Sequence, residues 1–208
     1  MKEKTIYFLF TDTGTVLSRL INYFTRKQLN HVSIAFDEDL QELYSFGRKN
    51  PNNPFSGGFV REDIHGEFLS KANCAVYSFQ LSEDDYYQIN TYIKRIEAEA
   101  CNYKYNFLGL IGVLLKIDLK RKNALFCSQF VATAMENVHG FQLDKPACFT
   151  TPADIREQGG LQLMYQGKLA DYQKQVEVDG KLITGTPIIA KQSLIFSVRE
   201  KVKQFVVR

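Results

Sequence analysis

The chain has 208 residues, and its 45% hydrophobic and 24% charged content is ordinary for a globular protein with one domain and its extensions. The formal net charge is +3, and residues 193–208 carry this excess, so the composition excludes the strongly basic character of nucleic-acid-binding proteins. The four cysteines lie too far apart along the chain to suggest a zinc site.

The N-terminus lacks a secretory pattern, and its apolar run is too short for a signal peptide. The longest apolar run, at 107–115, is also far shorter than the roughly 20 residues that a membrane-spanning helix needs. Both observations favour a cytoplasmic protein whose cysteines are reduced.

In chain order, the apolar run at 5–10 predicts a buried strand, and the apolar spacing over 13–24 predicts a helix after it. Large apolar residues alternate with polar or small residues at 31–36, which predicts a half-buried strand. Residues 42–47 predict a second strand that returns beside it as a hairpin. The Asn-, Pro- and Gly-rich stretch at 48–58 predicts an irregular loop.

Further strands are predicted at 59–64 and 74–81. A serine followed by three acidic residues predicts a capped helix over 82–100. Apolar periodicity that ends at a glycine predicts a second helix over 127–140, and 151–169 predicts a loop, a short helix and a strand.

These elements predict an α+β fold, with an antiparallel sheet of about five or six strands and helices packed on it. We expect one domain over 1–175 and a C-terminal extension over 176–208. The basic amphipathic segment at 193–208 is compatible with an anionic membrane surface, but its pattern favours packing on the domain or on a partner.

Cys127 stands at the predicted start of a helix, where unpaired N–H groups and the helix dipole stabilise a thiolate. His31 is the histidine placed to act as its base, because it shares a strand face with the small residues Ser33 and Ala35. That face leaves room for a cleft or for a helix packed across it. From the residues alone, structural roles for both side chains remain open.

Four segments, in this order, resemble those of the permuted papain-like hydrolases: "HVSIAF" at 31–36, "YKYNFLGL" at 103–110, "LFCSQFV" at 125–131 and "TTPADI" at 150–155. This family is the circularly permuted branch of the NlpC-type cell-wall peptidase superfamily and is related to the lecithin–retinol acyltransferases. The resemblance covers about residues 5–170. It implies a permuted papain-like fold and a cysteine-dependent amidase, peptidase or acyltransferase that needs no cofactor.

The resemblance assigns roles residue by residue. Cys127 matches the nucleophile and His31 matches the base. Tyr105, or less favourably Tyr103, matches a tyrosine near the oxyanion site, and Ser128 follows the nucleophile on the oxyanion and substrate side.

The family also has a third polar residue, which orients the imidazole from the strand after the histidine. Aligning "LYS" with the family pattern selects Ser45. A change of register by one residue selects Tyr44 or Glu42 instead, because successive side chains on a strand point to opposite faces.

The resemblance implies a small peptide-like or lipid-like substrate, and we expect an amide bond rather than an ester. One alternative is a lipid esterase or acyltransferase. The other is a module on the same fold that binds a ligand or partner without catalysis, and the lack of an evident orienting residue favours it.

Overall fold

The computed structural model describes residues 3–12, 28–48, 57–115, 117–119 and 121–174. The helix predicted over 13–24, most of the loop predicted over 48–58 and the extension at 176–208 lie outside the described residues. The chain divides into two compact units, 1–174 and 175–208, and the described residues all belong to the first.

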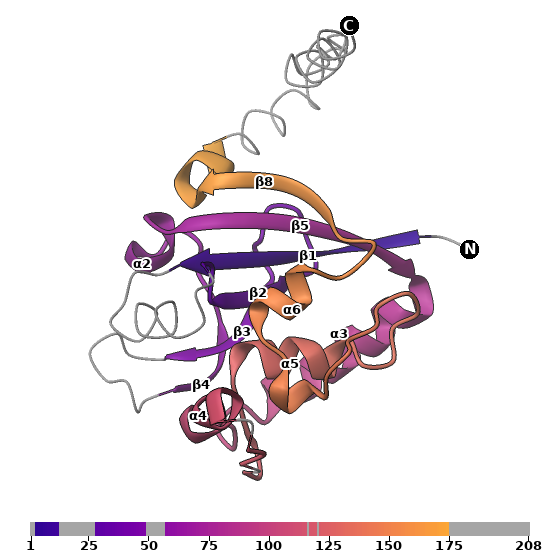
Figure 1. Ribbon diagram of the computed structural model, residues 1–208. Coiled ribbons are helices and arrows are strands. Elements are labelled where there is room, and N and C mark those ends of the chain that lie inside the picture. Colours follow the sequence, from indigo (N-terminus) through magenta and orange to yellow (C-terminus); the bar gives the residue numbers. More distant parts are fainter. Residues whose placement is uncertain (1–2, 13–27, 49–56, 116, 120, 175–208) are drawn as a thin grey trace, which may run out of the picture. The chain divides into compact units, whose positions relative to one another are not determined.

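A six-stranded sheet in the order β4-β3-β2-β1-β5-β8 runs through the described unit (Figure 1). All of its neighbouring strands are antiparallel. The predicted α+β class and antiparallel sheet are therefore confirmed. The strands are β1 (Glu3–Asp12), β2 (His31–Ala35), β3 (Leu43–Arg48), β4 (Gly57–Arg61), β5 (Asn73–Ser82) and β8 (Gln162–Lys168).

Short helices and a second, parallel pair of strands surround this sheet. They are α2 (Glu67–Ser70), α3 (Glu83–Ala98), β6 (Lys104–Tyr105), α4 (Phe107–Leu115), β7 (Ala124–Leu125), α5 (Cys127–Ala134), the 3-10 turn η1 (Ala147–Phe149) and α6 (Pro152–Arg156).

One face of the sheet carries the large side chains that α3 and α5 cover, and both helices lie on the same side of it in Figure 1. From β1 this face receives Ile6, Phe8 and Phe10, all fully buried. Burying each such side chain contributes roughly 1.5–3 kcal/mol, so this face is a major source of stability.

Helix α3 begins where the sequence predicts. The Ser82 hydroxyl caps it by accepting a hydrogen bond from the Asp85 N–H at 3.1 Å. Its buried side chains Ile89, Ile93 and Ile96 recur at helical spacing and pack on the sheet.

Helix α5 begins at Cys127 as predicted but ends at Ala134, well before Gly140. Beyond it the chain continues in turns, and the Val138 N–H donates to the Met135 carbonyl at 3.1 Å. Both Met135 and Val138 remain in the core, so the apolar periodicity outlasts the helix. Gly140 adopts a positive φ of 80° in the turn that follows.

The opposite face of the sheet contains Ser33 and Ala35, both fully buried, together with Leu9. The segment after β8 closes part of this side, and the Tyr172 hydroxyl donates to the Glu38 carbonyl at 2.8 Å. Of the two alternatives for the small-residue face, a cleft or a helix packed across it, α5 does not supply the second. That helix packs on the face with the larger side chains, which give it more apolar area to bury.

Candidate active site

His31 is the first residue of β2, at the end of the strand where β2 is not paired with β3. It is opposite Thr11 on β1. Toward β3, the backbone pairing of β2 involves Ile34 with Tyr44 and Ala35 with Leu43. A β-carbon added at Gly47 of β3 would lie 3.8 Å from the His31 Cε1 atom, so the imidazole occupies the space beside that glycine.

Cys127 is the first residue of α5 and is 3% exposed. The N-cap residue, Phe126, has no side chain able to cap the helix. The first intrahelical bond runs from the Phe130 N–H to the Phe126 carbonyl at 2.9 Å. The N–H groups of the first turn therefore lack intrahelical acceptors and face the region beside the Cys127 sulfur.

The packing of Phe130 fixes the position of α5 on the sheet. Its ring centroid lies 5.2 Å from that of Phe46 and 5.8 Å from that of Phe59. These two rings come from neighbouring strands, β3 and β4, and Tyr92 of α3 stacks on the same phenylalanine at 6.1 Å. A ring held by three others leaves the helix little freedom to slide along the sheet.

The structure brings Cys127, His31 and Glu62 together. The Cys127 thiol lies close enough to the His31 ring to raise the pKa of the imidazole. On its other side, His31 Nε2 lies 2.7 Å from Glu62 Oε1. The histidine and glutamate side chains are 20% and 10% exposed, so water screens this ion pair only partly.

Glu62 is itself held in place by β2 and β3. The Ser33 hydroxyl donates to its second carboxylate oxygen. Its backbone N–H donates to the Leu43 carbonyl at 2.8 Å, which continues the pairing with β3 just beyond the end of β4. Two anchors on one residue fix where the carboxylate meets the imidazole.

The charges of this group reinforce one another. Burial by itself would lower the pKa of His31, but the Glu62 carboxylate and Cys127 outweigh it, so the pKa of the imidazole lies well above its ordinary value. Burial would raise the pKa of Glu62, yet the positive charge and hydrogen bond of His31, with the Ser33 hydroxyl, hold it below its ordinary value. These interactions therefore favour an imidazolium beside the Glu62 carboxylate.

Ser45 was predicted to orient the imidazole, but its side chain makes a different contact. Its buried hydroxyl instead donates to the Val32 carbonyl at 2.8 Å. The bond lies where the backbone pairing between β2 and β3 ends, so the hydroxyl satisfies a carbonyl that the ladder leaves without a partner. The group that meets the ring comes from one strand further out.

The two alternative orienting residues, Tyr44 and Glu42, also make their contacts elsewhere. The Tyr44 hydroxyl accepts a hydrogen bond from Lys94 Nζ at 2.7 Å, on the face that α3 covers. The Glu42 N–H donates to the Asp37 side chain at 2.7 Å, in the turn between β2 and β3. Neither arrangement joins the residue to His31.

Glu62 was not among the predicted site residues, although a signal for it exists. Val60 is opposite Ser45 in the pairing of β3 with β4. Alternation then places Glu62 on the face that holds Ser45 and Ser33. Extending the strand register from β3 to β4 would therefore have identified Glu62.

Ser128 has a structural contact through its side chain. The hydroxyl is 1% exposed and donates to the Thr150 carbonyl at 2.7 Å, which ties the start of α5 to the "TTPADI" segment. In that segment Thr151 and Asp154 cap α6 reciprocally, with Pro152 in its first turn. The side chain of Ser128 is thus turned away from the thiol, and only its backbone N–H remains for the oxyanion side.

Tyr105 lies on β6, beside β4. A β-carbon at Gly57 would come within 2.8 Å of the Tyr105 Cβ atom, so the glycine allows the two strands to approach closely. Tyr103 packs its ring on Phe46, with centroids 6.0 Å apart. The role of either hydroxyl at an oxyanion site stays a prediction.

The other cysteines occupy different environments, and all four thiols are free. Cys74 is buried on the sheet, and burial raises the pKa of its thiol to about 11. Cys101 is exposed and Cys148 is partly exposed. Among the cysteines, Cys127 is the one that raises the pKa of the His31 imidazole.

No family model, curated protein or solved structure matches this chain. Over the part of the chain that is described, no helix combines the length and apolar character needed to cross a membrane. In the same part, no cluster of three or more histidine, cysteine or acidic side chains is arranged to hold a metal ion.

Proposed function

We propose that the chain is a cysteine-dependent hydrolase or acyltransferase with a permuted papain-like fold, in which Cys127, His31 and Glu62 form a catalytic triad. One observation carries this proposal: a thiol at a helix start lies close enough to an imidazole to raise the pKa of the ring, and Nε2 of that ring lies 2.7 Å from a carboxylate. A nucleophile, a base and a group that orients the base are the parts that acyl transfer requires.

Catalysis begins with proton transfer from the Cys127 sulfur to His31, which yields a thiolate–imidazolium pair. Because Glu62 engages Nε2, Nδ1 is the nitrogen that serves the thiol. The thiolate attacks the carbonyl carbon of the substrate and forms a carbon–sulfur bond. The negative charge moves to the carbonyl oxygen, which the first-turn N–H groups of α5 stabilise, with Tyr105 assigned to the same side.

The imidazolium then donates its proton to the leaving amine or alkoxide as the carbon–nitrogen or carbon–oxygen bond breaks. A thioester on Cys127 remains. Water, or another acceptor, attacks this thioester while His31 removes its proton. The carbon–sulfur bond then breaks, the acyl product leaves, and the imidazolium returns the proton to the Cys127 sulfur. Glu62 acts throughout by holding the ring orientation and stabilising its positive charge.

The substrate class that we favour has an amide bond, as in a small peptide or a modified protein, and a lipid ester is the alternative within the same chemistry. The thiol must stay reduced to act, and all four cysteines are free, so a reducing compartment such as the cytoplasm suits the proposal.

A non-catalytic binding module on the same fold was favoured by the apparent lack of an orienting residue. Glu62 supplies such a group, and this contact supports the enzyme over the binding module.

The test is to trap the acyl-enzyme. The protein is incubated with activated amides and esters of short acyl groups, quenched in acid, and examined by intact-mass and peptide mass spectrometry. We expect an added acyl mass on Cys127, none after Cys127→Ala, and slower accumulation after His31→Ala. Labelling that falls on Cys101 instead, and is unchanged by both variants, would contradict the proposal.

A further inference from the structure

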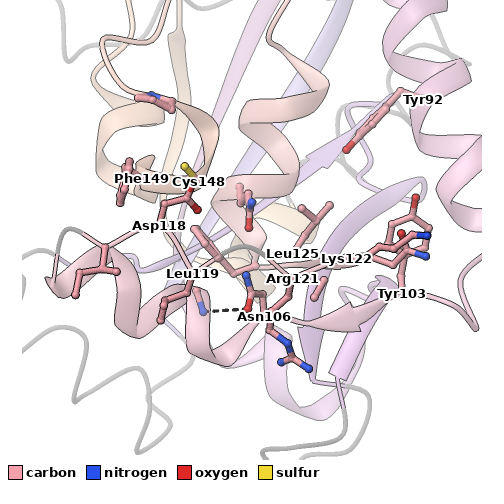
Figure 2. Close-up of a pocket in the computed structure, with 17 residues that line it drawn as sticks. Tyr92, Tyr103, Asn106, Asp118, Leu119, Arg121, Lys122, Leu125, Cys148 and Phe149 are labelled. Atoms are coloured by element: carbon pink, nitrogen blue, oxygen red, sulfur yellow. Dashed lines mark hydrogen bonds between the residues drawn. The ribbon is translucent and has the colours of Figure 1, made fainter.

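A cavity of about 730 Å³ lies beside α5, bounded also by α3, α4 and η1 (Figure 2). Such a volume is in the range of pockets that hold small molecules. Neither Cys127 nor His31 nor Glu62 lines it. Gln129 does, and in an α-helix a residue two positions after Cys127 is rotated by about 200° around the axis. The cavity therefore reaches the start of α5, where Phe126 lines it, but the three candidate catalytic residues do not line it.

Gln129 presents an unused hydrogen-bond acceptor at this cavity. Its Oε1 atom is buried and has no hydrogen-bond partner among the described residues. A buried amide oxygen without a donor is unfavourable, and such groups are rare in folded proteins. A ligand that enters the cavity with an N–H or O–H group would satisfy this atom.

The walls are aromatic and aliphatic. Tyr92, Tyr103 and Phe149 line the cavity, together with Leu125. In Figure 2 the labelled side chains of Tyr92 and Phe149 come from different elements, α3 and η1, and border the space from two sides. Rings and a leucine side chain favour an apolar or aromatic group in a ligand.

The stretch between α4 and β7 adds charge to the lining. Arg121 and Lys122 both line the cavity and are exposed, and Asp118 is the acidic residue beside them. Two cations against one carboxylate leave a net positive charge, which favours an anionic group at the mouth of the cavity.

We propose that this cavity binds an N-acylated amino acid or a short peptide with a free carboxylate. The amide N–H of the ligand donates to Gln129 Oε1, its apolar side chain packs against the tyrosines and Phe149, and its carboxylate lies near Arg121 and Lys122. Binding at this site does not depend on the chemistry proposed for Cys127.

The experiment uses the full chain and three matched probes, titrated by isothermal calorimetry and by amide chemical shifts. N-acetyl-L-phenylalanine has the donor, the ring and the carboxylate. 3-Phenylpropanoate lacks the N–H donor, and N-acetyl-L-phenylalaninamide lacks the carboxylate. We expect the complete probe to bind, and each incomplete probe to bind about three- to tenfold more weakly. Added salt should weaken the binding of only the two probes that carry a carboxylate.

Variants separate the contributions. Gln129→Leu should remove the preference for the N–H donor, and Arg121→Gln with Lys122→Gln should remove the preference for the carboxylate. The control, Lys71→Gln with Lys104→Gln, removes two exposed cations that do not line the cavity and should leave both preferences unchanged. Circular dichroism checks that each variant is folded, and if Gln129→Leu fails to fold, the pair of probes with and without the N–H still tests the donor contact.

Cys127→Ala should bind the complete probe as the native chain does, so failure of the catalytic proposal leaves this one standing. Two results would overturn it. One is no binding of the complete probe in the millimolar range by a folded chain. The other is binding that neither the Gln129 variant nor the cation pair alters and that the three probes share equally.

Discussion

The three residues of the candidate site depend on one another through charge. His31 lies between a thiol and a carboxylate, and both raise the pKa of the imidazole against the opposing effect of burial. A protonated His31 therefore stabilises the fold fully below the ordinary histidine pKa of 6.5, and that contribution is lost as pH rises through the elevated pKa in the folded state. The lowered pKa of Glu62 contributes stability above its ordinary value of 4.5, and this is lost as pH falls through the folded pKa.

Glu62→Gln tests the charge coupling. The amide keeps the shape of the side chain but removes its negative charge, so the pKa of His31 should fall. The stability attributed to protonated His31 should then disappear at lower pH than in the native chain. Titration of the imidazole ring signals by NMR measures the pKa of His31 directly. An unchanged His31 titration would show that the carboxylate does not act on the ring.

Ser45→Ala distinguishes a structural role from an orienting one. The variant leaves the Val32 carbonyl without its hydrogen bond at a buried position, so the free energy of unfolding should fall by about 1–3 kcal/mol. The pKa of His31 should stay the same. Denaturant unfolding and the NMR titration give the two readouts, and a shifted histidine pKa with unchanged stability would restore Ser45 to the site.

The sequence predicts the two ends of this site but not its third member. A helix start and a strand face of small residues make Cys127 and His31 candidates, and the resemblance to the permuted papain-like hydrolases selects them. The choice of Ser45 assumed that the strand after the histidine supplies the orienting group. In the structure the serine hydroxyl satisfies a backbone carbonyl, and Glu62 reaches the ring from one strand further out. Contacts between non-neighbouring strands depend on twist and on where pairing stops, which periodicity does not contain.

At the scale of elements, the position of α5 decides whether the thiol meets the ring. Phe130 holds the helix against β3 and β4, and Ser128 ties its start to the Thr150 carbonyl. The capping box of α6 then fixes the backbone that follows Thr150. The "TTPADI" segment is thus a support for the helix that carries the nucleophile.

Thr151→Ala removes the N-cap of α6. Loss of a threonine cap should lower the free energy of unfolding by about 1 kcal/mol. Because α6 supports the start of α5, alkylation of Cys127 should also slow. Ser82→Ala is the matched control, since it removes a cap of similar strength from α3. Thermal unfolding and labelling rates measure both effects, and an equal change in Cys127 labelling in the two variants would contradict a specific support role.

For the whole molecule, the central strands β1 and β2 are buried on both faces of the sheet, whereas the edge strand β8 is largely exposed. The α+β class and the antiparallel sheet were predictable because strand alternation and helix periodicity are local signals. The face that each helix covers was not predictable, because α5 packs on the side of the sheet with the larger apolar area rather than beside the small side chains. The end of α5 was also missed, because turns after Ala134 continue the same apolar spacing.

A chain that ends at residue 174 should fold on its own. The hydrophobic core cluster lies entirely within this unit, so unfolding by denaturant should remain a single cooperative transition. The pKa of His31 should equal that of the full chain, since its partners, Cys127 and Glu62, are retained. A broad transition, or a lost histidine shift, would show that residues 175–208 are needed for the fold.

The central claim is that Cys127 and His31 form a reactive pair, and the most direct measurement is the rate of iodoacetamide labelling at each cysteine. At about pH 6 the nearly buried Cys127 should react faster than the exposed Cys101, and His31→Ala should abolish this advantage. Labelling that simply follows exposure, with Cys101 first and Cys127 as slow as the buried Cys74, would contradict it.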